Sequence, residues 1–86
     1  MDTLVQRNER LERLHRTIAQ ILGVPAADID DSSSPEQLST WDSLNHLNLV
    51  MALEQEFGLS LSIEDALEMR TVGSIRTVLA RHGIDC

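Results

Sequence analysis

Three polar side chains that could take part in catalysis stand close together in the sequence: Asp42, Ser43 and His46. Ser43 and His46 are three residues apart, so a helix would bring them to neighbouring positions on one face. A Ser-His-Asp hydrolase would also need an oriented base, an oxyanion hole and a substrate pocket. Asp42 is badly placed to orient His46, and no nucleophile-elbow pattern surrounds the serine. The sequence therefore argues against a hydrolase, and Asp42 or Ser43 is first of all the cap of the helix that begins here.

Other kinds of catalytic or metal site find even less support. The three histidines are dispersed, and the acidic clusters lack the EF-hand spacing with its glycine and terminal glutamate. There is no glycine-rich phosphate loop, and two aromatic residues are too few for a base-stacking platform. Cys86, the single cysteine, can form no disulfide within the chain. We therefore expect a protein that is not an enzyme and holds no metal.

Charge is distributed unevenly along the 86 residues, which carry a formal net charge of −7. All of the excess negative charge lies in residues 24–69, which contain ten acidic residues and no Arg or Lys. Such a segment repels nucleic acid and anionic membranes and attracts basic protein surfaces. No apolar run approaches the roughly 20 residues of a membrane span, and no signal-peptide core begins the chain. We expect a monomeric, cytoplasmic protein that binds neither nucleic acid nor membrane.

Helical periodicity and capping signals predict four helices. Residues 3–22 form an amphipathic helix, with Asp2 or Thr3 as cap and Gly23 as its end. Residues 23–41 form a long loop, in which Ser34-Pro35-Glu36 starts a short helical turn. A capping box at Ser62 opens a short helix through about Glu68, and Thr71 caps a last helix through about His82. The apolar stripe of the first helix comprises Leu4, Leu11, Leu14, Ile18, Ile21 and Leu22.

The helix predicted for residues 43–57 carries two apolar faces. Leu49, Val50, Leu53 and Phe57 share one face, which suffices to bury the helix in a small bundle. Leu44, Leu47 and Met51 share another, on the side where Ser43 projects, and an exposed apolar patch there would suggest a partner site. No alternating strand pattern of useful length occurs. Residues 1–86 thus predict a single all-α domain of four helices.

These residues together resemble an acyl carrier protein. The resemblance rests on Asp42-Ser43-Leu44, the long loop before it, the segment Leu49 to Phe57 after it and the short third helix, and it extends from about Leu11 to Gly83. It implies that Ser43 is the attachment point for 4′-phosphopantetheine, which a separate phosphopantetheinyl transferase transfers from coenzyme A. The arm ends in a thiol that holds acyl groups as thioesters.

The resemblance also implies where partners and cargo bind. Acyl-loading and acyl-processing enzymes with basic or apolar surfaces would dock along the second helix, on Asp42, Leu44, Leu47, Met51, Glu54 and Glu56. The acyl chain would lie between the second and third helices, against His46, Leu53, Leu61, Ala66, Leu67 and Met69, although ordinary core packing explains these residues equally well. Trp41 replaces the small residue usual in the family, and would either cover the arm or pin the loop.

One departure from the family pattern indicates which kind of pathway this carrier serves. Asn45, Asn48 and Gln55 stand where carriers of fatty-acid synthesis typically have acidic residues, which weakens electrostatic steering of a basic partner. We therefore expect a stand-alone carrier of a specialised fatty-acid, polyketide or related pathway. Two alternatives remain open: a peptidyl or aminoacyl carrier, which shares the fold and arm, and an unmodified helical interaction module.

Overall fold

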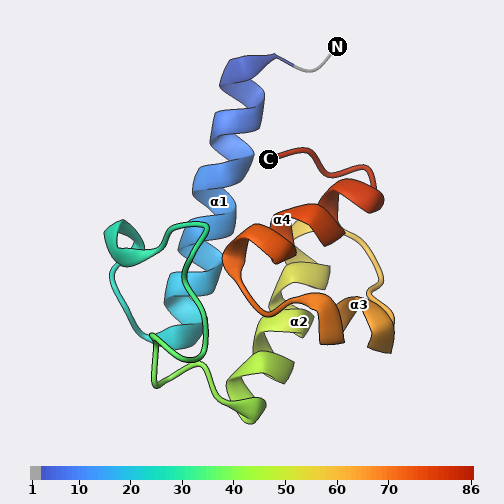
Figure 1. The fold of residues 1–86 in the computed structure, drawn as a ribbon. Helices are drawn as coiled ribbons and strands as arrows, with labels where there is room; N and C mark the ends of the chain where they lie inside the picture. The colour runs from blue at the N-terminus through green and yellow to red at the C-terminus, as the bar shows by residue number, and fades with distance from the viewer. Residues whose placement is uncertain (1–2) are drawn as a thin grey trace.

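The computed structural model describes residues 3–86 as a bundle of four α-helices, α1 Leu4–Leu22, α2 Ser43–Phe57, α3 Ile63–Glu68 and α4 Val72–Arg81. A single 3₁₀ turn, η1 Ala26–Asp28, lies in the long connection between α1 and α2. Figure 1 shows the long α1 on one side of the bundle and the short α3 on the other. No strand occurs within residues 3–86. The predicted all-α class, the long loop and the short third helix are confirmed.

Capping side chains set the helix boundaries where the sequence predicts them. The Thr3 side chain accepts a hydrogen bond from the Gln6 backbone N–H, which leaves Thr3 as the cap of α1; the alternative, Asp2, lies outside the described residues. Ser62 and Thr71 form capping boxes at α3 and α4. Gly23 ends α1 with φ +68°, a left-handed conformation that glycine adopts without a Cβ penalty.

The core lies where α1, α2 and α4 meet. Its fully buried side chains include Leu14 and Ile18 of α1, Leu49 and Leu53 of α2, and Ile75 of α4. Each of these leucines and isoleucines contributes roughly 1.5–3 kcal/mol when fully withdrawn from water. The predicted stripe of α1 is wrong at one residue: Leu4 is 70% exposed, because the first turns of α1 extend past the rest of the bundle (Figure 1).

The long loop is ordered because its backbone supplies partners to the start of α4. The Val72 and Gly73 N–H groups, which have no acceptors within their helix, donate to the carbonyls of Ser33 and Asp31 at 3.1 and 3.0 Å. Arg76 of α4 adds an ion pair to Asp31 at 2.7 Å. The predicted turn at Ser34-Pro35-Glu36 is present, but Ser34 contributes its carbonyl, which accepts from Leu38 N–H at 2.9 Å.

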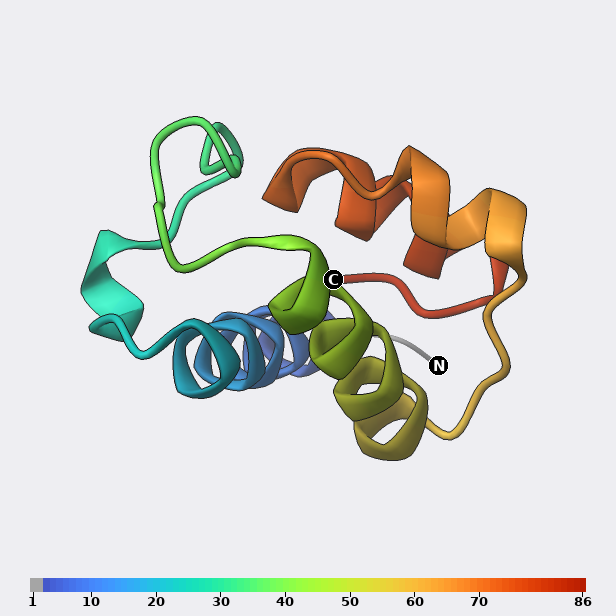
Figure 2. The same ribbon diagram turned by 90° about the horizontal axis from the view of Figure 1, so that it is seen from below.

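The short α3 is fixed to α4 through polar contacts at both of its ends. The imidazole Nε2–H of His82 donates to the Asp65 carboxylate at 2.9 Å, and Arg81 pairs with Glu68 at 2.7 Å. The hydrogen bond from His82, with a second from the Ser62 N–H, lowers the pKa of Asp65 from its usual value. Figure 2 shows α3 and α4 as one layer above α1 and α2. Within residues 3–86, no helix is both long and apolar enough to cross a membrane.

Candidate functional site

Ser43 is the first residue of α2, and its side chain is exposed. Its hydroxyl forms no hydrogen bond within residues 3–86. Asp42 takes the capping role instead: its Oδ1 accepts from the Asn45 N–H at 2.9 Å, with extended backbone angles at Asp42. The sequence left Asp42 and Ser43 as alternative caps. The structure assigns the cap to Asp42, so the Ser43 hydroxyl does not cap the helix.

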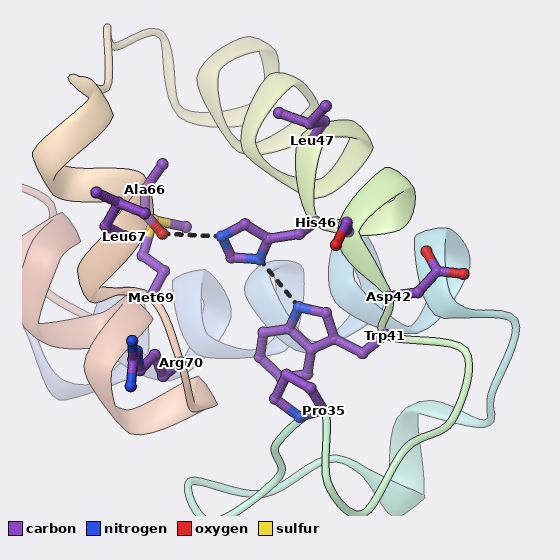
Figure 3. A pocket seen from close by; sticks show the side chains of 10 residues that line it. Pro35, Trp41, Asp42, His46, Leu47, Ala66, Leu67, Met69 and Arg70 are labelled. Atoms are coloured by element: carbon purple, nitrogen blue, oxygen red, sulfur yellow. Dashed lines mark hydrogen bonds between the residues drawn. The ribbon is translucent and has the colours of Figure 1, made fainter.

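A pocket of about 590 Å³ opens beside Ser43, between the start of α2, the end of α3 and the loop before α2 (Figure 3). Its volume lies within the roughly 300–1,000 Å³ usual for small-molecule sites. Four of the six residues predicted to line an acyl pocket do line this one: His46, Ala66, Leu67 and Met69.

The other two predicted lining residues are placed elsewhere, which corrects the sequence-based grouping. Leu53 is fully buried in the core, because it lies in the second half of α2, where that helix packs into the bundle. Leu61 precedes α3 and packs against the core, and its N–H donates to the Glu54 carboxylate at 2.9 Å. Neither residue reaches the pocket.

His46 and Trp41 form a hydrogen-bonded chain along one wall of the pocket (Figure 3). Trp41 Nε1–H lies 3.0 Å from His46 Nδ1, and His46 Nε2 lies 2.8 Å from the Ala66 carbonyl. An indole N–H can only donate, so Nδ1 is the acceptor and the proton of the neutral ring is on Nε2, which donates to Ala66. Trp41 is 3% exposed, so it pins the loop into the core; it does not stand as a cover over the site.

Asp42, Ser43 and His46 do not form a Ser-His-Asp triad in this structure. Both ring nitrogens of His46 are occupied, one by Trp41 and one by Ala66, so neither is directed to Ser43. Asp42 bonds to a backbone N–H and does not orient the imidazole. Among residues 3–86, no group of three or more Cys, His, Asp or Glu side chains is placed to bind a metal ion.

The second apolar face of α2 is exposed, as its spacing predicts. Leu44, Leu47 and Met51 are 68%, 61% and 56% exposed. We call these three residues the α2 apolar face. They extend from Ser43 along the solvent side of the helix, and Leu47 also borders the pocket. Such a patch suits a protein partner.

The two glutamates predicted to belong to the docking surface are Glu54 and Glu56. Glu56 lies on another side of α2, and Glu54 already accepts a hydrogen bond. Glu56 follows Leu47 by nine residues, which at 100° per residue places it on the opposite side of α2. There it pairs with Arg13 of α1 at 2.9 Å, so its assignment to the docking face is corrected. Glu54 lies on the same side as Leu47, but its carboxylate accepts from the Leu61 N–H.

Two further residues line the pocket that sequence reasoning did not single out, Pro35 and Arg70. Arg70 is the one basic residue in the lining, and its guanidinium forms no hydrogen bond or ion pair with the described residues. Arg70 follows α3 and Ser43 begins α2, so the two residues are far apart in the sequence. Only the fold shows that both line the same pocket. The one available signal was that Arg70 is the first basic residue after the acidic segment 24–69.

Comparison with known proteins places this geometry in a family. The family model for the phosphopantetheine attachment site matches residues 12–79. A solved structure from Mycobacterium tuberculosis, assigned as an acyl carrier protein, is 32% identical with a TM-score of 0.71, over 83% of this chain and 95% of that one. Carriers of this family are generally non-catalytic, and they interact with a phosphopantetheinyl transferase and with acyl-processing enzymes. The chain therefore belongs to the acyl carrier protein family, whose domains hold a covalently attached 4′-phosphopantetheine.

Proposed function

We propose that Ser43 is the residue that receives the 4′-phosphopantetheine arm, and that the loaded protein presents acyl groups to the enzymes of a specialised pathway. One observation carries the assignment: the Ser43 hydroxyl is exposed, unbonded and adjacent to an apolar pocket at the start of α2. Attachment joins the serine oxygen to phosphorus, while the serine proton and the nucleotide portion of coenzyme A leave. The arm supplies a thiol on which acyl groups are held as thioesters.

The surroundings of Ser43 suit a phosphodiester. The first N–H groups of α2 point towards this end of the helix, and the helix dipole favours a negative charge there. Arg70 lines the same pocket and has no partner among the described residues, so its guanidinium is available to an anion. Asp42 opposes this effect with its own charge, so its contribution is to cap α2 and to offer a contact to the transferase.

The pocket suits the apolar part of a tethered cargo. Leu47, Ala66, Leu67 and Met69 supply apolar surface, and both nitrogens of His46 are already satisfied. The amides at Asn45 and Asn48 favour dedicated partners over the general enzymes of fatty-acid synthesis. Asn45 donates to the Thr40 carbonyl at 2.8 Å, so one of these amides supports the loop before Ser43.

Intact mass and peptide mapping test this function. The purified chain is incubated with coenzyme A and a broad-specificity phosphopantetheinyl transferase. We expect a mass gain equal to one phosphopantetheine, and proteolytic fragments should localise it to the peptide that contains Ser43. The pKa of the Cys86 thiol is raised by burial, so a thiol reagent at neutral pH should label the arm in preference to Cys86. An unchanged mass, or a modification on another peptide, would contradict the proposal.

The α2 apolar face should act as the docking surface for the transferase. Replacing Met51 by glutamate places a charge in the middle of an apolar contact, and loss of one such contact typically costs about 1–2 kcal/mol, or roughly tenfold in the rate of transfer. The measurement is kcat/KM for arm transfer, with circular dichroism as a check of helicity. Gln20→Glu, on the exposed side of α1, makes the same change of charge away from this face and should leave the rate unchanged. Equal rates for the Met51 variant and the unaltered chain would place docking elsewhere.

A further inference from the structure

The pocket beside Ser43 ends after one turn of α2. Its lining from this helix comprises Ser43, His46 and Leu47, although α2 continues for ten more residues to Phe57. Leu53 lies on the same side of the helix as His46, about 10 Å further along its axis at 1.5 Å per residue. It is fully buried and outside the pocket. The space between α2 and α3 is therefore closed between His46 and Leu53.

The His46 ring stands at this closed end. It bridges the two helices, because it projects from α2 and its Nε2–H reaches the Ala66 carbonyl of α3 at 2.8 Å. Trp41 holds it from the loop through the hydrogen bond to Nδ1, with the two ring planes only 19° apart and their centroids separated by 6.2 Å. Figure 3 shows the three groups joined by the two hydrogen bonds, from Trp41 through His46 to Ala66.

The bridge resists displacement. If the His46 ring rotated away, the Trp41 N–H would lose its acceptor, and Trp41 is almost completely buried. The Ala66 carbonyl would keep only the longer hydrogen bond from the Met69 N–H, at 3.3 Å. A buried polar group that loses its hydrogen bond retains the full cost of its desolvation. A purely apolar chain that entered this position could not replace His46 as the acceptor for the Trp41 N–H, because it offers no acceptor.

We propose that the His46 ring sets the length of the acyl group that the pocket shelters and restricts it to short chains. The inference rests on the proposed attachment at Ser43. A short chain fits between Ser43 and the ring, against Leu47, Leu67 and Met69. The additional carbons of a longer chain stay in solvent, because the path towards Leu53 is blocked by the ring and its two hydrogen bonds.

Melting temperatures of acylated proteins test the limit. The chain is loaded by the transferase from a series of saturated acyl-coenzyme A thioesters of increasing length, and the rise in Tm over the unacylated holo-protein is recorded for each. For the unaltered protein we expect the rise in Tm to increase with acyl length only for short acyl chains and to stay constant for longer ones. For His46→Ala it should continue over several more carbons, by up to roughly 3–6 °C for each methylene that becomes buried.

A matched variant distinguishes the effect of the ring's volume from the effect of its hydrogen bonds. His46→Phe loses the same two hydrogen bonds as His46→Ala but keeps an aromatic ring in the path, so it should level off closer to the unaltered protein than to His46→Ala. Each variant is compared with its own unacylated form, which removes the cost of the substitution itself. The proposal is overturned if all three proteins level off at the same length, or if both variants extend the series equally.

A measurement on the unaltered protein keeps the test independent of variant folding. Trp41 is the only tryptophan, so its indole N–H gives a single NMR signal. We expect this signal to stop changing once the chain exceeds the plateau length; a shift that keeps growing with longer chains would show the ring displaced and overturn the limit. Failure of the attachment itself is recognised separately, because no mass gain would then appear on the Ser43 peptide.

Discussion

Replacing Ser43 by alanine should abolish the mass gain produced by coenzyme A and transferase, while the fold remains intact. The loss should be complete, because the substitution removes the oxygen that forms the new bond to phosphorus. Stability should change by less than about 0.5 kcal/mol, as for surface positions without a special structural role. Asp42 supplies the cap of α2, and alanine is a good helix former at the first helical position.

Ser62→Ala provides the opposite control. Ser62 is also an exposed serine at the start of a helix, but its side chain accepts from the Asp65 N–H and closes a capping box. Its loss should lower stability by about 0.5–2 kcal/mol and leave the mass gain unaffected. The measurements are intact mass after transfer and urea denaturation followed by circular dichroism. A mass gain that persists in Ser43→Ala would show that the arm is attached elsewhere.

The features predicted correctly from the sequence depend on local spacing. The bounds of α2, the capping box at Ser62, the cap at Thr71 and the exposure of the α2 apolar face all follow from residues within one or two turns of each other. The prediction that Leu4 is buried was wrong for a reason that residue spacing cannot reveal. Leu4 has the correct helical phase, but no other element extends far enough along α1 to cover it.

The candidate site was predicted less completely because its contacts join distant segments. The pairing of Glu56 with Arg13 and the bond from His46 to the Ala66 carbonyl span 43 and 20 residues. On the sequence alone, His46 is grouped with the residues expected to line an acyl pocket, and Trp41 is identified as a departure from the family pattern. The sequence could not show that the two form one chain of hydrogen bonds, because the acceptor in α3 is a backbone carbonyl, which every residue possesses.

Replacing Trp41 by alanine should lower the free energy of unfolding by about 3–5 kcal/mol, the usual cost of removing a large buried aromatic side chain. This is a large share of the roughly 5–15 kcal/mol that stabilises most domains. Trp41 is 3% exposed, belongs to the central core and donates to His46. Trp41→Phe keeps most of the ring but leaves His46 Nδ1 without its donor, so it should cost less, about 1–3 kcal/mol. Urea denaturation followed by far-UV circular dichroism measures both, since neither variant retains the indole.

Trp41→Ala should also slow the transfer of the arm to Ser43, by more than its effect on stability explains. Trp41 fixes the end of the loop immediately before Asp42 caps α2, so its loss should let the start of α2 fray and slow arm transfer even where the protein is folded. Leu79→Ala is the matched control: Leu79 is fully buried in α4, and its truncation should cost a comparable 2–5 kcal/mol. We expect kcat/KM, corrected for the folded fraction, to fall only in Trp41→Ala. An equal fall in both variants would mean that Trp41 supports Ser43 through global stability alone, and that the local link from loop to helix contributes nothing.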